Sequence, residues 1–304
     1  MKIAVLLPCF NEGAAIKQCV SQFRMALPDA AIYVYDNNST DNSVEAALEA
    51  GAIVRSEKMQ GKGNVVRRMF SDIDADVYIL ADADSTYDAS CAPMMVKLLC
   101  DDVLDMVVGK RVSTEQDAYR TGHRFGNTVL NKILRYLFGN SFTDILSGYR
   151  VFSRRFVKTF PLLSLGFEVE TEISIHALEL KLPVAEIETP YFARPSGSQS
   201  KLNTYRDGFR ILRTIASLFR IERPVAFFGA ISAALLLLAL GLATPLAITY
   251  FKTGLVPRLP TAVLATGISL IAALGLVCGI ILDTVVRGRR EVRRLAYLAY
   301  HPPH

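Results

Sequence analysis

Two long segments without a charged residue lie near the end of the chain, and they constrain its fold more than any other feature. Residues 225–251 and 259–282 contain no Asp, Glu, Lys or Arg. Each segment exceeds the roughly 20 apolar residues that an α-helix needs to span a bilayer. Both lie far from the N-terminus, so neither is expected to be a signal peptide. We therefore predict a two-helix transmembrane hairpin over residues 223–286, with two buried core helices as the alternative.

Basic residues flank the hairpin on one side and set its expected orientation. The connecting loop carries only Lys252 and Arg258, whereas arginines precede and follow the two segments: Arg210, Arg213, Arg220, Arg223, Arg287, Arg289, Arg290, Arg293 and Arg294. The positive-inside rule places both termini, and the domain before the hairpin, in the cytoplasm, as expected for a bacterial inner-membrane protein. The formal net charge of +5 is then mainly juxtamembrane and suits an anionic leaflet. Residues 287–304 are expected to form a basic cytoplasmic tail.

A basic amphipathic segment leads into the hairpin. From Leu202 to Arg220, apolar residues recur at helical spacing on one face and arginines occupy much of the rest. Such a helix beside a span is typical of the membrane interface, and we predict an interfacial helix over residues 202–222. An ordinary surface helix of the soluble domain is the alternative. The small residues of both spans favour close pairing of the two helices, and Asp283 with Arg287 is expected to form an anchor pair at the inner interface.

The first 110 residues alternate between strand and helix signals. The β-rich apolar runs are residues 2–7, 31–35, 53–54 and 77–80, and the helical segments between them are 14–26, 43–50 and 63–71. Repeated βαβ units predict an α/β domain with a mostly parallel sheet and helices on both faces. The five cysteines show no C-x-x-C spacing, which favours free thiols in a cytoplasmic domain.

Polar clusters follow the first, second and fourth of these strands. They are Asn11-Glu12, residues 36–41, and Asp82-Ala83-Asp84. Ligands of open α/β sheets bind outside the carboxyl ends of the strands, so the clusters predict one binding crevice. Magnesium typically takes one or two carboxylates together with substrate phosphates. A strand that runs into Asp82-x-Asp84 therefore favours a metal–diphosphate site, although aspartate is also common in turns and helix caps.

In their order along the chain, several motifs together resemble the inverting family-two glycosyltransferases. The motifs are Pro8-x-Phe10-Asn11-Glu12, residues 36–41, Gly61-Lys62-Gly63, Asp82-x-Asp84, Gly109-Lys110-Arg111, Asp144-x-x-Ser147-Gly148-Tyr149-Arg150, and Arg194-Pro195-x-Gly197-Ser198-x-Ser200-Lys201-Leu202. The last two are similar to the polyisoprenyl-phosphate branch, which includes dolichol-phosphate mannose synthase and bacterial undecaprenyl-phosphate sugar transferases. The resemblance covers residues 1–222 and implies a GT-A-like nucleotide-sugar-binding domain over residues 1–201. The membrane hairpin also fits that branch.

For the donor side, the resemblance implies a hexosyltransferase that uses a UDP- or GDP-sugar with Mg²⁺ or Mn²⁺. Asp84, with Asp82 nearby, would hold the metal, which acts as a Lewis acid on the leaving diphosphate. The candidate donor-binding residues are Pro8, Phe10, Asn11, Glu12, Asp36, Asn38, Lys62, Asp82, Ala83 and Asp84. Related sequences often continue Asp-x-Asp-Leu-Gln-His, whereas Thr86 here replaces the glutamine that is thought to help hold the metal.

For the acceptor side, the resemblance implies a polyprenyl phosphate of the undecaprenyl type. A lipid phosphate is already anionic and needs positive charge more than a strong base, and arginine suits phosphate. The candidate acceptor residues are Arg111, Arg124, Asn127, Arg194, Ser200 and Lys201, with Arg120 and Arg135 in reserve. Asp82, Asp84, Asp144 and Arg124 form the expected catalytic set. Asp144 could orient an arginine, act as a base or cap a turn, and Glu170 could serve the site or an internal ion pair.

The expected function is thus transfer of a sugar to polyprenyl phosphate on the cytoplasmic face, for cell-envelope glycan biosynthesis. Another lipid or a glycan as acceptor is one alternative, and a non-catalytic nucleotide-sugar-binding membrane scaffold is another. A processive polymerase is disfavoured because the chain has no Gln-x-x-Arg-Trp motif. Membrane lipids and a second copy of the chain are possible partners, and no nucleic-acid module is present to bind the basic residues.

Overall fold

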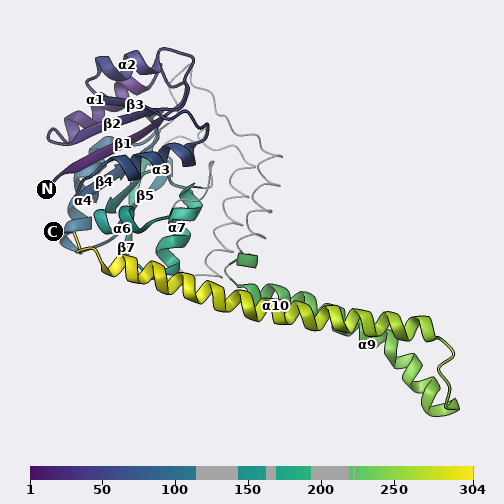
Figure 1. Cartoon of the computed structure of the whole chain (residues 1–304). Coiled ribbons are helices and arrows are strands. Elements are labelled where there is room, and N and C mark those ends of the chain that lie inside the picture. The colour runs from purple at the N-terminus through teal and green to yellow at the C-terminus, as the bar shows by residue number, and fades with distance from the viewer. Residues whose placement is uncertain (114–142, 162–168, 193–218, 222, 304) are drawn as a thin grey trace. The chain divides into compact units, whose positions relative to one another are not determined.

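The computed structural model of the protein, drawn in Figure 1, describes residues 1–113, 143–161, 169–192, 219–221 and 223–303. The chain forms two compact units. The first comprises Met1–Tyr205 together with Arg293–His304, and the second comprises Arg206–Val292. The first unit holds the α/β domain, and the second holds the long apolar helices.

The first unit is built on a seven-stranded mixed sheet of order β3-β2-β1-β4-β6-β5-β7. The strands are β1 (Ile3–Cys9), β2 (Ala31–Asp36), β3 (Ile53–Ser56), β4 (Val77–Leu80), β5 (Met106–Ser113), β6 (Arg150–Ser153) and β7 (Val184–Tyr191). Strands β1 to β4 pair in parallel, and β7 is parallel to β5. Strand β6 runs antiparallel to both of its neighbours. The predicted α/β class with a mostly parallel sheet is confirmed.

Helices connect these strands and cover the sheet. They are α1 (Ile16–Ala26), α2 (Ser43–Glu49), α3 (Lys62–Asp72), the short η1 (Ala89–Cys91), α4 (Ala92–Asp101), α6 (Arg154–Thr159) and α7 (Val169–Glu179). The chain steps outward from β1 to β3 and then back to β4, so right-handed crossovers place α1 and α2 on one face and α3 on the other.

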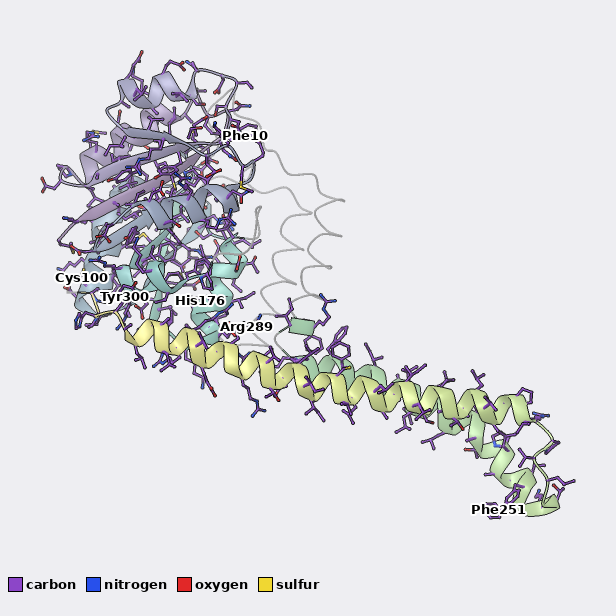
Figure 2. All side chains as sticks on the ribbon, viewed as in Figure 1. Phe10, Cys100, His176, Phe251, Arg289 and Tyr300 are labelled. Atoms are coloured by element: carbon purple, nitrogen blue, oxygen red, sulfur yellow. The ribbon has the colours of Figure 1, made fainter. Side chains whose placement is uncertain are left out.

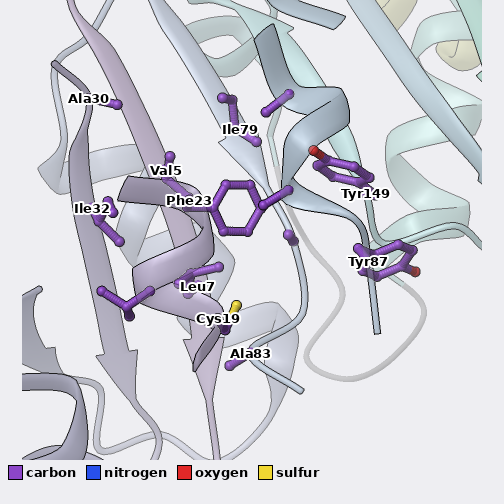
Figure 3. Close-up of a cluster of buried hydrophobic side chains, with 14 of the residues drawn as sticks. Val5, Leu7, Cys19, Phe23, Ala30, Ile32, Ile79, Ala83, Tyr87 and Tyr149 are labelled. Carbon is purple, nitrogen blue, oxygen red and sulfur yellow. The ribbon is translucent and has the colours of Figure 1, made fainter. Parts of the chain in front are cut away.

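The main core lies between the sheet and α1. Ile16, Cys19, Val20 and Phe23 recur at helical spacing and are the buried residues of α1. Figure 3 shows the Phe23 ring inside the cluster that also holds side chains of β1 and Tyr149. The Phe23 and Tyr149 rings meet edge to face, with centroids 6.1 Å apart. This packing anchors the chain just before β6.

The sheet topology gathers the predicted polar clusters at one edge. In the parallel register Cys9 pairs with Asp36, and Leu6 pairs with Leu80. Strand β6 is antiparallel, so its first residue, Arg150, pairs with the last residue of β4. The segment before β6 therefore lies at the edge of the sheet where β1, β2 and β4 end.

The second unit contains α9 (Pro224–Thr253) and most of α10 (Leu259–Leu298), which are long and apolar enough to cross a membrane. Within the most apolar windows only 11% and 17% of residues are buried, whereas a soluble core helix would be mostly buried. The two helices pack through small residues: a Cβ on Gly275 would lie 2.8 Å from Ser232 Oγ. The predicted Asp283–Arg287 pair is present at 2.8 Å.

The end of α10 belongs to the first unit. The Tyr297 hydroxyl donates to Asp105 Oδ2 at 2.8 Å, and Arg293 pairs with Glu179 at 2.6 Å. Asp105 is fully buried and also accepts two hydrogen bonds from Arg155. Within the predicted basic tail, residues 287–304, Arg293 and Tyr297 thus contact buried carboxylates of the α/β domain. The predicted interfacial helix at 202–222 lies almost wholly outside the described residues.

Buried His176 on α7 gives a prediction about acid stability. Neither ring nitrogen has a hydrogen-bond partner within the described part of the chain, and Phe156 and Phe160 pack against the ring. Burial, aided by the charge of Arg293, lowers the pKa of His176 to about 3. The unfolded chain therefore binds a proton between about pH 6.5 and pH 3 that the native state does not, so acid destabilises the protein. At pH 5 the loss should be about 2 kcal/mol.

His176→Phe should remove this loss. We expect the thermal midpoint of the full-length variant in detergent to fall less between pH 7.5 and pH 5 than that of the wild type. His301, which is exposed, provides the control, and His301→Phe should retain the wild-type acid sensitivity. Equal acid sensitivity of His176→Phe and wild type would contradict the argument.

Candidate active site

The segments that follow β1 and β2 are hydrogen-bonded to each other at the carboxyl edge of the sheet. The backbone N–H of Asn11 donates to Ser39 Oγ at 2.9 Å, and that of Glu12 donates to Ser43 Oγ at 2.8 Å. The Asn11 side-chain oxygen accepts the Thr40 N–H at 2.7 Å. Asn11, a predicted donor contact, thus uses its side chain to fix the opposite loop. Phe10, another predicted donor contact, also lies on the first unit (Figure 2). Ala83, which was predicted to contact the donor as well, is buried.

Asn37, which the sequence did not single out, connects this edge to α3. Its side-chain nitrogen donates to the backbone carbonyls of Glu57 and Met59, both at 2.8 Å, and its oxygen accepts the Gly61 N–H at 2.7 Å. Asn38 donates to the carbonyl of Lys58 at 2.9 Å. The sequence signals for Asn37 were its place in a polar run directly after a strand and in the motif of residues 36–41. Its contacts fix the start of α3.

Asp84 is almost fully buried at the end of β4, and its own turn orients it. Asp84 Oδ1 accepts the Thr86 hydroxyl at 2.6 Å and the Thr86 N–H at 3.2 Å. Ser85 between them has a φ of 57°, which allows the chain to turn back. Thr86, at the position where related sequences have glutamine, therefore holds the Asp84 carboxylate in place. Asp36 is similarly buried and accepts the Ser39 N–H at 3.2 Å and 3.3 Å.

Lys62, the first residue of α3, joins two carboxylates. Its Nζ lies 2.5 Å from Asp82 Oδ1 and also pairs with Glu170 of α7. The side chains of Lys62 and Glu170 are 11% and 8% exposed, and that of Asp82 is 33% exposed. Burial by itself lowers the pKa of Lys62, but the two carboxylates outweigh it and raise the pKa above its ordinary value. Glu170 thus forms an ion pair that is part of the site.

Gly148 lets the segment before β6 approach Asp82 closely. A Cβ at Gly148 would lie 2.9 Å from Asp82 Oδ2, so a larger residue would displace the carboxylate. The Gly148 N–H donates to the Tyr87 hydroxyl at 2.9 Å, and burial raises the pKa of Tyr87. Tyr87 was not predicted as a site residue. It fixes the backbone that lies against Asp82.

Arg111 and Asp144 form a two-point ion pair in the same region. Arg111 Nε and Nη2 donate to Asp144 Oδ2 and Oδ1, both at 2.8 Å, and the Arg111 backbone N–H donates to Oδ2 at 3.2 Å. Burial by itself raises the pKa of Asp144, but Arg111 outweighs it and holds the pKa below its ordinary value. The guanidinium carbon lies 5.6 Å from the centre of the Tyr191 ring. These are the contacts of a carboxylate that orients an arginine.

Arg150 shapes the segment that carries Asp144. It is fully buried, and its Nε and Nη2 donate to the carbonyls of Ser147 and Ile145 at 2.8 Å and 2.5 Å. The Ser147 hydroxyl donates to the carbonyl of Gly109 on β5 at 2.6 Å. The motif from Asp144 to Arg150, which resembles that of family-two glycosyltransferases, therefore has a structural role: it connects β5 to the turn before β6.

Comparison with known proteins identifies the family. The sequence matches the description "Glycosyl transferase family 2" over residues 4–160. Glycosyltransferase AglJ of Haloferax volcanii is 31% identical over 291 residues, which is 95% of each chain. The protein belongs to glycosyltransferase family 2. The dolichyl-phosphate hexose transferase of H. volcanii is 25% identical to this glycosyltransferase over 221 residues, covering 73% of this chain and 95% of the relative.

A solved structure supports the fold of the glycosyltransferase. Glucosyl-3-phosphoglycerate synthase from Mycobacterium tuberculosis, in complex with Mn²⁺ and UDP-glucose, matches with a TM-score of 0.59 and 22% sequence identity. The match covers 72% of this chain and 78% of the other. The catalytic unit is therefore GT-A-like, as the sequence motifs predicted.

The carboxylates of the glycosyltransferase fit a metal that binds together with a diphosphate. Among the residues that the structure describes, no three His, Cys, Asp or Glu side chains gather into a potential metal site. Asp84 and Asp82 offer hard oxygen ligands, and magnesium commonly binds one or two carboxylates plus substrate phosphates. This donor set suits a cation that arrives with the nucleotide sugar.

Several predicted acceptor residues lie outside the described part of the chain. They are Arg120, Arg124, Asn127, Arg135, Arg194, Ser200 and Lys201. Arg111 is the predicted acceptor residue that lies within the described part of the chain. Asp144 and Lys62 lie at the same edge of the sheet as Arg111.

Proposed function

We propose that this glycosyltransferase moves a hexose from a nucleoside diphosphate sugar to a polyprenyl phosphate at the cytoplasmic face of a membrane. The observation that carries the proposal is the ion pair between Arg111 on β5 and Asp144. Asp144 lies on the segment before β6, whose Gly148 lies against Asp82. A cation fixed at the same edge of the sheet as the donor carboxylates is suited to an anionic acceptor. The two apolar helices supply a reason for the acceptor to be a lipid.

Relatives support each half of the proposal. The dolichyl-phosphate hexose transferase of H. volcanii and a dolichol-phosphate mannosyltransferase of Pyrococcus furiosus, 25% identical over 238 residues, favour a polyprenyl phosphate acceptor. The mycobacterial synthase structures with Mn²⁺ and UDP-glucose, or with Mg²⁺ and UDP, favour a nucleoside diphosphate sugar and a divalent cation.

The residues of the site have distinct roles in this mechanism. Asp84 and Asp82 would hold Mg²⁺ or Mn²⁺, which when bound neutralises charge on the leaving diphosphate. Lys62 supplies a second positive charge next to Asp82. The Asp36 loop and the Pro8 to Glu12 loop form the wall for the nucleoside. We place the Arg111 guanidinium at the acceptor phosphate, with Arg124, Asn127, Arg194, Ser200 and Lys201 as further contacts.

Asp144 is assigned to orientation and not to proton abstraction. Its pKa lies below the ordinary value, and both of its oxygens accept hydrogen bonds from Arg111. A carboxylate whose pKa is lowered is a weaker base. An ionised lipid phosphate can attack the anomeric carbon directly, so the reaction has little need of a base. The arginine asymmetry around the hairpin supports a cytoplasmic location for this chemistry.

The proposal is tested with the purified full-length protein, undecaprenyl phosphate and a panel of UDP- and GDP-sugars. Nucleotide should be released with one of the sugars, only when the lipid carries a phosphate. Chelation should stop release, and Mg²⁺ or Mn²⁺ should restore it. Undecaprenol without phosphate is the matched control. Transfer to diacylglycerol or to a glycan, with none to the lipid phosphate, would overturn the acceptor assignment.

A further inference from the structure

The carboxylate of Glu186 on β7 binds the backbone at Thr143 and Asp144. The Thr143 N–H donates to both Glu186 oxygens at 2.8 Å and 2.9 Å, and its hydroxyl donates to Oε2 at 2.7 Å. The Asp144 N–H donates to Oε1 at 3.0 Å. One carboxylate thus accepts hydrogen bonds from three donors on two consecutive residues. The sequence did not single out Glu186.

Asp144 connects Glu186 to Arg111. Its backbone is bound by Glu186, whereas its carboxylate is bound by Arg111 through two guanidinium nitrogens. Glu186 and Arg111 lie on the paired strands β7 and β5, where Glu186 is in register with Val108. Without Glu186, the backbone at Thr143 and Asp144 would lose these hydrogen bonds to β7.

We propose that Glu186 is a positioning residue for the acceptor phosphate. It fixes the Asp144 backbone, and Asp144 in turn sets the direction of the Arg111 guanidinium. This inference rests on the proposed function, in which Arg111 meets a lipid phosphate. Arginine recognises phosphate through a planar set of N–H donors, so its orientation matters as much as its charge. A displacement of about 1 Å can cost on the order of a hundredfold in rate.

Glu186→Gln tests the proposal, with Glu188→Gln as the matched control. Glutamine keeps the size of Glu186 but puts an amide nitrogen against N–H and O–H donors. Glu188 lies two residues further along β7, is exposed, and pairs with Lys110 at 2.9 Å. We expect Glu186→Gln to raise the KM for undecaprenyl phosphate about tenfold to a hundredfold. The KM for the nucleotide sugar and the thermal midpoint should stay close to those of Glu188→Gln.

Two further variants separate positioning from folding. Thr143→Val removes only the hydroxyl donor to Glu186 and should raise the acceptor KM by a few-fold, in the same direction. Adding Glu186→Gln to Asp144→Asn should cause little further loss, because Glu186 acts through Asp144. Additive losses, or an equal rise in the donor KM, would overturn the proposal.

Failure of this inference differs from failure of the proposed function. If the wild type transfers no sugar to any lipid phosphate, the proposed function is wrong and the inference falls with it. If the wild type is active and Glu186→Gln behaves as Glu188→Gln does, only the inference is wrong.

Discussion

Replacing Asp84 with asparagine in the full-length protein should lower sugar transfer about a thousandfold. The Asp84 carboxylate is almost fully buried at the end of β4, and Thr86 holds one of its oxygens. Asparagine keeps the size but removes the charge that a divalent cation requires. Losing the metal's stabilisation of the leaving diphosphate costs several kcal/mol, and each 1.36 kcal/mol is tenfold in rate.

Initial rates across a titration of Mg²⁺ and Mn²⁺ measure this effect. Asp88→Asn is the control, since Asp88 lies four residues further along and caps η1 through the Ser90 N–H at 2.9 Å. Asp88→Asn should keep nearly the wild-type rate, and both variants should unfold near the wild-type temperature. Unchanged transfer by Asp84→Asn in the presence of a chelator would disprove the metal assignment.

Replacing Lys62 with methionine should destabilise the protein by about 3–5 kcal/mol, because it removes the cation that pairs with the buried Glu170 carboxylate and the partly exposed Asp82 carboxylate. Lys62 pairs with both Asp82 and Glu170, and the Lys62 and Glu170 side chains are largely buried. The same change removes a positive charge beside the donor carboxylates, so transfer should also fall. Thermal unfolding in detergent and transfer assays report the two effects separately.

A second variant distinguishes the two roles of Lys62. Lys62→Met with Glu170→Gln also removes the buried carboxylate charge that Lys62 pairs with on α7, and it should recover much of the stability, while transfer stays low. Lys17→Met is the control, since the Lys17 and Glu49 side chains of that pair are 61% and 65% exposed, and such surface pairs contribute little. Stability of Lys62→Met equal to that of Lys17→Met would show that the buried pair does not stabilise the fold.

Local sequence patterns determined the class of the domain and the edge of the sheet at which its polar clusters lie. Strand and helix periodicities over the first 80 residues predicted βαβ units, and parallel strands place their carboxyl ends at one edge. The register of Cys9 with Asp36 confirms that arrangement. The two apolar helices were equally predictable, because length and the absence of charge are local properties of the chain.

Only the tertiary structure decided which side chains meet at that edge. The antiparallel insertion of β6 between β4 and β5 brings Gly148 against Asp82. Lys62 meets Glu170 across 108 residues of sequence, and Glu186 meets Thr143 across 43. Such contacts depend on strand order and register, and no periodicity within a short window encodes them. The same holds for Tyr297, whose buried partner Asp105 lies 192 residues away. Local patterns therefore fixed the elements, while long-range pairing of polar groups built the site.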